Sequence, residues 1–222
     1  MVPPRFQKDS QEEKEVAPAA SFDFVIPYVH SGDGGQELCK ALATLKNVLD
    51  WSGKVWIVGD YESWFEDLSG LEHLPCPPAG NKWLGIQAAL IKACKTHEVS
   101  DDFYYSNDDI YIWDQFFHIP PFYREPIDEH ADKVDSLYSQ SLIATKRLLI
   151  RQGIDDVSNY EGHTPLPVNK SKLAETLSTI TRIQDSGYMP LQLRTYYGNM
   201  WDIGGEFYAD GKHKDGLAIT SS

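Results

Sequence analysis

Short apolar runs alternate with amphipathic segments along the first half of the chain. Apolar and β-branched residues fill positions 22–29, 54–60 and 102–106, and a weaker run covers 71–76. Polar, glycine or proline residues close each run, as in the glycine-rich turn at 31–35. Apolar runs of this length, bounded by turn residues, are typical of buried strands. We therefore expect four strands in the first half.

Other segments follow a helical period. Apolar residues recur every three or four positions over 36–49 and 81–97, and Asn81 is a suitable N-cap for the second of these helices. Two more helices are expected later, over 139–152 and 172–180. The order strand, helix, strand, strand, helix, strand predicts an α/β fold, in which a mostly parallel sheet carries helices on both faces.

The chain has 222 residues, and the pattern predicts a single folded domain over 21–210. The polar, proline-containing segment 1–20 is expected to be a disordered tail, and 211–222 a flexible C-terminal tail. No run approaches the roughly 20 apolar residues that span a bilayer. The 3 cysteines show no pairing pattern, which favours a reducing, cytoplasmic location.

Charge narrows the classes of partner. The chain carries 20 Lys+Arg against 33 Asp+Glu, a formal net charge of −13. Affinity for nucleic acid comes largely from basic side chains that displace counterions. We therefore do not expect this chain to bind nucleic acid through its overall charge. A polyanionic ligand would have to meet a metal ion or a local basic pocket.

Two adjacent carboxylates, Asp108 and Asp109, follow the strand at 102–106 and precede another apolar stretch. Neighbouring carboxylates between hydrophobic runs repel each other and resist desolvation unless a cation meets them. Mg²⁺ or Mn²⁺ takes oxygen ligands and commonly bridges one or two carboxylates to substrate phosphates. The alternative is a solvated, Asp-rich turn. Because ligands of parallel sheets bind beyond the carboxyl ends of the strands, we favour the metal site.

Several features occur in a recognisable order along the chain: the strand 22–29, the strand 54–60 ending in Val-Trp-Ile-Val-Gly-Asp, the helix opening at Asn81, Phe-Tyr-Tyr-Ser-Asn-Asp-Asp at 103–109, Gly-His-Thr-Pro at 162–165, and Arg194. With them, roughly residues 22–200 resemble the Stealth-type sugar-phosphate transferases and related phage-borne glycosyltransferase-like proteins. The resemblance implies a GT-A-like fold with a nucleotide-sugar site and an acidic metal motif. The chain is shorter than those proteins and lacks their Asp-x-Val-Tyr-Thr-Trp strand, which leaves the transferred group open.

The resemblance and the chemistry together suggest roles for four residues. Negative charge accumulates on a departing nucleotide diphosphate, so a cation held by Asp109, with Asp108 as a direct or indirect partner, would lower the barrier. His163 would complete the metal shell or act as base for an acceptor hydroxyl; otherwise it is a surface-loop histidine. Arg194 would clamp phosphate oxygens, or else be a solvated arginine.

The remaining candidates would bind the nucleotide-sugar. Lys82, beside Asn81 at a helix start, could meet a phosphate, because helix N-termini attract anions; a solvated lysine is the alternative. Asn107 precedes the carboxylate pair. Asp60 could accept hydrogen bonds from a ribose or base, or simply belong to a turn. Tyr28 could stack on the nucleobase.

The leading functional hypothesis is a Mn²⁺- or Mg²⁺-dependent glycosyltransferase that moves a sugar from a nucleotide-sugar donor to a hydroxyl acceptor. Sugar-1-phosphate transfer of the Stealth type is one alternative. A second is a phage enzyme that glycosylates hydroxylated pyrimidines in DNA, against which the net charge argues. A third, from a different class, is a non-catalytic module that binds nucleotides or carbohydrates.

Overall fold

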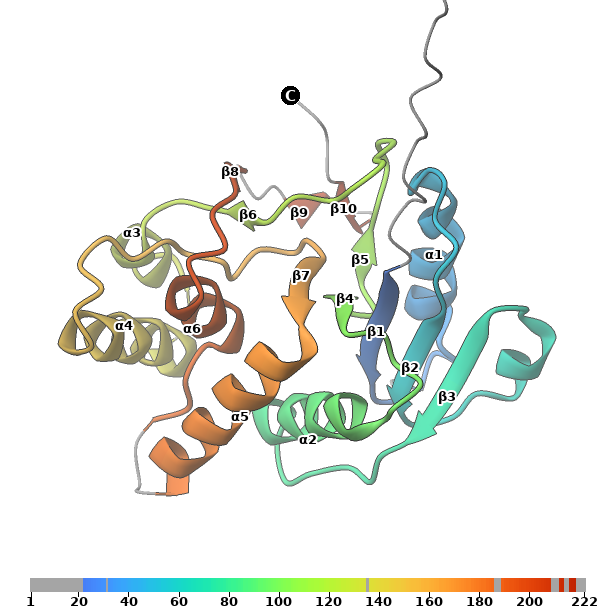
Figure 1. The fold of residues 1–222 in the computed structure, drawn as a ribbon, viewed down its shortest axis with the longest axis horizontal. Helices are drawn as coiled ribbons and strands as arrows, with labels where there is room; N and C mark the ends of the chain where they lie inside the picture. Colours follow the sequence, from blue (N-terminus) through green and yellow to red (C-terminus); the bar gives the residue numbers. More distant parts are fainter. Residues whose placement is uncertain are drawn as a thin grey trace, which may run out of the picture.

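The computed structural model describes residues 22–30, 32–134, 136–185 and 189–208, together with the backbone of 212–213 and 216–218. Figure 1 shows a central sheet with helices on both of its faces. The segment 1–20, expected to be a disordered tail, lies outside the described residues.

The central sheet has five strands, four of them parallel. Their spatial order is β3 (Leu71–Pro75), β2 (Val55–Gly59), β1 (Asp23–Tyr28), β4 (Asp102–Tyr105) and β7 (Leu166–Asn169). The first four run parallel to their neighbours, and β7 is antiparallel to β4 at one edge. The α/β class with a mostly parallel sheet, predicted from the order of apolar runs, is confirmed.

Both faces of the sheet are covered, which explains why its strands are apolar throughout rather than alternating. Along β1, Phe24 and Ile26 belong to one hydrophobic core and Val25 to the other. Helix α1 (Gln36–Thr44) packs in the first core, while α2 (Lys82–Lys95), α5 (Lys170–Asp185) and α6 (Leu193–Met200) pack in the second.

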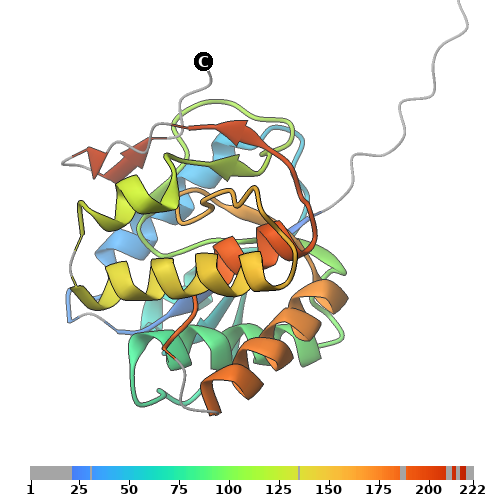
Figure 2. The same ribbon diagram turned by 90° about the vertical axis from the view of Figure 1, so that its left-hand side faces the viewer.

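The second half of the chain adds a helical layer beside the sheet. It contains β6 (Phe122–Tyr123), α3 (Ile127–Ala131), α4 (Ser136–Arg151) and β8 (Glu206–Phe207). Helix α3 packs on α4, and α4 packs in turn on α6, as Figure 2 shows from the side of these helices. This layer brings the loops around α3 and before α6 toward the carboxyl end of β4.

Several elements differ from the sequence expectation. The helix expected over 36–49 ends at Thr44 and continues as the 3-10 helix η1 (Leu45–Asn47), because the backbone of Asn47 and Leu49 instead bonds to Phe116. Strand β7 and helix α6 were not anticipated. The 3-10 helix η2 (Ser63–Asp67) also fills the connection from β2 to β3.

The segment 211–222, expected to be a flexible tail, lies largely outside the described residues. Its described backbone forms β9 (Lys212–His213) and β10 (Gly216–Ala218), and β10 pairs in parallel with β5 (Ile110–Tyr111). In the described part of the chain, no helix is both long enough and apolar enough to cross a membrane.

Candidate functional site

Two adjoining cavities open at the carboxyl ends of the parallel strands. The first, about 470 Å³, lies beyond β1, β2 and β4 and is lined by Asp60, Asp108, Asp109 and Lys82; we call it the acidic cavity. The second, about 460 Å³, is lined by Lys82, Arg124, Lys133, Arg194 and Glu161, with His130 and His163; we call it the basic cavity. Lys82, Ile86 and Asn107 line both.

Of the nine residues singled out in the sequence, seven line the acidic cavity: Tyr28, Asp60, Asn81, Lys82, Asn107, Asp108 and Asp109. They come from four separate segments that end at the same edge of the sheet. The parallel topology gathers those at strand ends, because successive parallel strands present their carboxyl ends on one side. Asn81 and Lys82 reach the same cavity as the start of α2, which follows β3.

Asp108 and Asp109 form a turn between β4 and β5, and both are partly buried. Burial, and after it the charge of Asp109, raises the pKa of Asp108 to about 6. Among the side chains of the described residues, Asp109 Oδ1 is buried with no hydrogen-bond partner. A buried carboxylate oxygen without a partner is rare and points to a missing counter-ion, water or ligand.

These two carboxylates fit a hard divalent cation. Mg²⁺ is usually held by one or two carboxylates together with substrate phosphates and water. A cation would give the Asp109 oxygen a partner, and it would oppose the burial and the repulsion by Asp109 that raise the Asp108 pKa. Within the described residues, no group of three His, Cys, Asp or Glu side chains is arranged to hold a metal.

His163 does not join the carboxylate pair. It lies in the loop before β7, half-buried, and lines the basic cavity, whereas Asp108 and Asp109 line the acidic one. The structure thus separates the histidine from the two carboxylates with which the sequence suggested that it would share a metal. Its place in the basic cavity leaves the alternative role, as a base, open as a prediction.

Tyr28 lies at the end of β1 with only 2% of its surface exposed. Its hydroxyl donates to Glu62 Oε1 at 2.6 Å, and its ring packs edge-on against Phe65. Burial, and after it the bond to Glu62, raises the tyrosine pKa. This packing leaves little of the ring for a nucleobase to stack on, in contrast to the sequence expectation.

Glu62 also ties the loop after β1 to the loop after β2. His30 Nδ1 shares Glu62 Oε1 with the Tyr28 hydroxyl, and the His30 backbone N–H donates to Asp60 Oδ2 at 2.9 Å. The hydrogen bonds from Tyr28 and His30 lower the Glu62 pKa, and the same bond to Glu62 raises the pKa of His30. Asp60 therefore shapes the rim of the acidic cavity as well as lining it.

Helix α2 starts between the two cavities. Asn81 is its N-cap, and its side-chain oxygen accepts a hydrogen bond from the Leu84 backbone N–H at 3.0 Å, which confirms the predicted capping. Lys82, the first helical residue, is exposed and lines both cavities. Its ammonium group can therefore reach an anion on either side.

Arg194 is buried on α6, with 4% of its surface exposed. Its Nη1 donates to the Thr164 carbonyl at 2.6 Å, and its Nη2 donates to Asn107 Oδ1 at 3.2 Å. The guanidinium also lies over the Tyr105 ring, 4.3 Å from its centroid. The sequence suggested a phosphate clamp; the structure shows a side chain whose hydrogen bonds hold the 161–164 loop and Asn107 in place.

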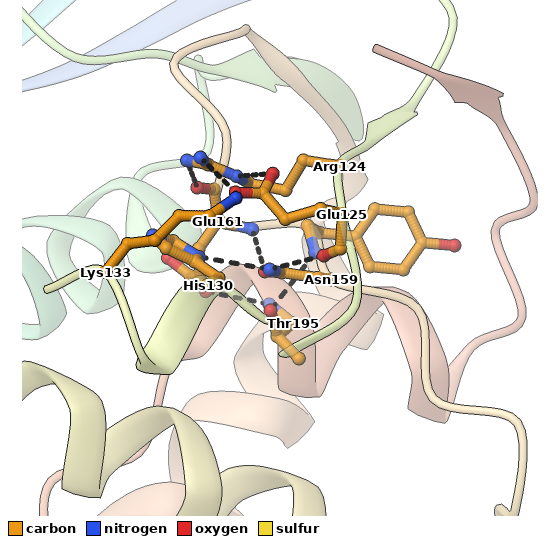
Figure 3. Close-up of polar contacts among 8 residues, drawn as sticks. Arg124, Glu125, His130, Lys133, Asn159, Glu161 and Thr195 are labelled. Atoms are coloured by element: carbon orange, nitrogen blue, oxygen red, sulfur yellow. Dashed lines mark hydrogen bonds and ion pairs between the residues drawn. The ribbon is translucent and has the colours of Figure 1, made fainter. Parts of the chain in front are cut away.

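The far wall of the basic cavity is a polar network that the sequence did not reveal (Figure 3). Arg124 donates from Nε and Nη2 to the two Glu125 oxygens at 2.8 and 3.0 Å, and Lys133 Nζ lies 3.4 Å from Glu125 Oε1. The Arg124 bonds, against a smaller opposing effect of burial, lower the Glu125 pKa to about 2. Arg124 Nη1 also donates to the Glu161 carbonyl at 3.2 Å.

Glu161 and His130 complete this wall. The Glu161 carboxylate accepts from the Thr195 backbone N–H at 2.9 Å, and burial raises its pKa. His130 is 4% exposed and contacts the Asn159 amide at 3.1 Å. In the sequence these residues look like ordinary charged positions of an irregular region. The single usable signal was the proximity of Glu161 to the Gly-His-Thr-Pro segment.

Comparisons with known proteins add little. No protein-family model matches the chain, and no curated protein sequence matches it. Among solved structures, the chain is similar to the crystal structure of 4-diphosphocytidyl-2C-methyl-D-erythritol synthase from Anaerococcus prevotii, with 12% identity, a TM-score of 0.40, and coverage of 90% of this chain and 91% of that chain. A likeness of this degree carries no information about activity.

Proposed function

We propose that the protein is a metal-dependent transferase that moves a sugar from a nucleotide-sugar to a hydroxyl acceptor. The observation that carries this proposal is the Asp108–Asp109 turn, with its unpartnered buried oxygen, in a cavity that adjoins a second cavity of similar volume. A transferase needs two such sites side by side, because the donor and the acceptor must meet in a fixed geometry.

The acidic cavity is the proposed donor site. Its volume of about 470 Å³ lies within the range of small-molecule sites, and its walls combine apolar groups with a few polar ones. The Pro77–Pro78 segment and Ala89 supply apolar surface, while Asp60 offers acceptor oxygens to a ribose or base. Lys82 at the start of α2 would neutralise phosphate charge.

Asp109 and Asp108 would hold Mn²⁺ or Mg²⁺, which when bound supplies Lewis-acid stabilisation of the departing diphosphate. Lys82 would hold the same diphosphate from the other side, and Asn107 would present its amide N–H groups toward the boundary between the cavities. The Asn107 oxygen is already engaged by Arg194, so the orientation of this amide is fixed before a substrate arrives.

The basic cavity is the proposed acceptor site. His163 in its wall would accept the proton of the acceptor hydroxyl at a ring nitrogen, since an imidazole titrates near neutral pH. Trp83 and Tyr138 supply flat apolar surface against which a sugar ring can pack.

Calorimetry with a panel of nucleotide-sugars, with and without Mn²⁺, tests the proposal. We expect one nucleotide-sugar to bind only when Mn²⁺ is present, and Asp109→Asn to abolish that binding while leaving the fold intact. A protein that binds free sugar and ignores the nucleotide would contradict the proposal.

The nucleotide released in turnover then separates two chemistries. A nucleoside diphosphate would support glycosyl transfer, whereas a monophosphate would contradict it and indicate sugar-1-phosphate transfer.

A further inference from the structure

We propose that Gly85 on α2 determines which donors the acidic cavity admits, because its missing side chain leaves the space that the nucleoside end of the donor occupies. Gly85 is the fourth residue of α2 and lines the acidic cavity. The identity of the ligand rests on the proposed transferase function, whereas the open space beside the glycine does not. Gly85 would therefore be a specificity-determining residue rather than a catalytic one.

Helix α2 is the ridge that divides the two cavities. Its cavity-lining residues follow one another around the helix: Trp83 and Gln87 line the basic cavity alone, Ile86 and Lys82 line both, and Ala89 and Gly85 line the acidic cavity alone. Successive residues of an α-helix are turned by about 100°, which gives this order around the axis. Gly85 lies at the end of the arc and faces away from the basic cavity.

The described structure gives no packing reason for a glycine at position 85. A Cβ there would meet no atom of the described residues within 4 Å, and the backbone does not have a positive φ. The Gly85 N–H donates to the Asn81 carbonyl at 2.9 Å, as in a regular helix. Inside a helix, glycine is about 1 kcal/mol less favourable than alanine. The helix therefore loses stability here, and what it gains is open space in the cavity.

This space lies at the end of the acidic cavity that is farthest from the basic one. The basic cavity is lined by Tyr105 at the end of β4 and by the start of α6. Helix α2 contacts β1 and β2, and the strands follow in the order β3, β2, β1, β4. The side of α2 that turns away from the basic cavity therefore faces β2 and β3. Asp60 follows β2, the Pro77–Pro78 segment follows β3, and both line the acidic cavity.

The carboxylate pair lies at the other end of the same cavity. Asp108 and Asp109 follow β4, which is three positions from β3 in the sheet. Neighbouring strands lie about 4.8 Å apart, so roughly 14 Å separate the two ends. A ligand that reaches both is elongated, with an anionic group at the carboxylate end, where the metal is proposed to bind, and a less polar body at the Gly85 end. A nucleoside diphosphate has this order of groups.

The surroundings of Gly85 suit a flat ring. The helix surface carries no side chain at this position, and Ala89, one turn later on the same side, carries only a methyl group. The Pro77–Pro78 segment adds apolar surface, and Asp60 offers carboxylate oxygens to hydroxyl or amino groups. A nucleobase has two flat apolar faces and polar edges. A larger side chain at position 85 would take up the volume that such a ring needs.

Calorimetry on the full chain in the presence of Mn²⁺ tests this inference. The probes are the diphosphates of uridine, cytidine, adenosine and guanosine, together with inorganic pyrophosphate. We expect at least one nucleoside diphosphate to bind the wild type, and Gly85→Leu to weaken that binding at least tenfold, because the added side chain competes for the same volume. Gly85→Ala should weaken it by a smaller factor, about two- to fivefold. Pyrophosphate, which has no nucleoside, should bind Gly85→Leu and the wild type equally.

Gly80→Leu is the matched control. A Cβ at Gly80 also meets nothing within 4 Å, and its φ is not positive, but Gly80 precedes α2 and lines neither cavity. This variant should bind every probe as the wild type does. The Tm of Gly85→Leu should equal or exceed that of the wild type, since leucine favours a helix over glycine. A lower Tm would show that the glycine has a structural role and would overturn the inference.

Three binding results would also overturn it. The first is that none of the four nucleoside diphosphates binds the wild type. The second is that Gly85→Leu and Gly85→Ala bind the nucleoside diphosphate as tightly as the wild type does. The third is that Gly85→Leu loses pyrophosphate as well, which would show that the new side chain disturbs the carboxylate end.

These outcomes are separable from those of the proposed function. If Gly85→Leu weakens the binding of a nucleoside diphosphate that Asp109→Asn still binds without Mn²⁺, the nucleoside site stands and metal-dependent transfer fails. If a nucleotide-sugar binds with Mn²⁺ through Asp109 and Gly85→Leu binds it as the wild type does, the donor site stands and the role of Gly85 is excluded.

Discussion

Arg194 Nη2 donates a hydrogen bond of 3.2 Å to Asn107 Oδ1, which joins helix α6 to the loop after β4 across 87 positions of sequence. Asn107 lines both cavities, so this bond fixes the side chain that stands between them. The second guanidinium bond, to the Thr164 carbonyl, fixes the loop that carries His163. One buried arginine therefore aligns parts of both proposed sites.

Replacing this arginine should cost stability as well as activity. Arg194→Met removes two hydrogen bonds and leaves the Thr164 carbonyl without its donor. We therefore expect the free energy of unfolding, measured in urea, to decrease by about 2 to 4 kcal/mol. Arg182→Met, at an exposed arginine of α5, should stay within about 0.5 kcal/mol of the wild type. Equal stabilities for the two variants would contradict the proposed role of Arg194.

Asp108 should destabilise the protein when no cation is bound. Its pKa is raised from 3.8 to about 6, so the folded state binds a proton more tightly than the unfolded state does. The resulting penalty is absent below pH 3.8 and complete above pH 6, where it amounts to roughly 1 to 3 kcal/mol. Asp108→Asn should therefore raise Tm at pH 7.5 in metal-free buffer.

The same variant should lose its response to metal. Mn²⁺ should raise the wild-type Tm but leave that of Asp108→Asn unchanged, because binding to the folded state alone stabilises it. A lower Tm for Asp108→Asn than for the wild type in metal-free buffer would show that the carboxylate is a structural hydrogen-bond acceptor rather than a metal ligand.

The contact between His30 and Glu62 should depend on pH. Because Glu62 raises the His30 pKa above 6.5, the contact stabilises the fold below pH 6.5, and this contribution is lost as the pH rises through the raised value. In an NMR titration, Glu62→Gln should move the His30 pKa down toward 6.5. Glu66 lies in η2, of which Glu62 is the N-cap, and it accepts a hydrogen bond from the Tyr61 hydroxyl; Glu66→Gln should therefore leave the His30 pKa unchanged.

Gly198 should not tolerate a side chain. A Cβ at this position would overlap the ring of Tyr160, which is 4% exposed and anchored through its hydroxyl to the Gly204 carbonyl at 2.8 Å. Gly198→Ala should therefore destabilise the protein by about 1 to 3 kcal/mol. Gly85→Ala, where a Cβ meets nothing within 4 Å, should stabilise α2 by up to about 1 kcal/mol. Thermal unfolding of both variants tests this contrast.

The sequence predicted the parallel strands of the sheet well, but it did not predict the antiparallel edge strand β7 or helix α6. Strands β1, β2 and β4 are buried on both faces, so their apolar runs stand out without any knowledge of topology. Strand β7 has four residues, one of them Pro167, and lies at an edge, so its apolar content is too low to mark it. Helix α6 is almost wholly buried, which removes the alternation of apolar and polar positions by which a helix is recognised.

The two cavities of the candidate site also differ in how far the sequence could predict them. The acidic cavity was accessible to sequence reasoning because most of its candidate residues lie at or just after the ends of strands, and parallel strands place those positions together. The basic cavity was not, because the segment around α3 that carries Arg124, His130 and Lys133 meets the loop at Glu161 only in the folded chain. The burial of Arg194 could not be predicted for a related reason, since it depends on contacts with residues 30 and 87 positions away.

The most direct test of the central claim is a Mn²⁺ titration followed by electron paramagnetic resonance, in the presence of a nucleoside diphosphate. We predict that the wild-type protein binds one Mn²⁺ per chain and that Asp109→Asn binds none, while both remain folded by circular dichroism. Equal Mn²⁺ binding by the two proteins would contradict the claim that the unpartnered carboxylate of Asp109 is a metal ligand.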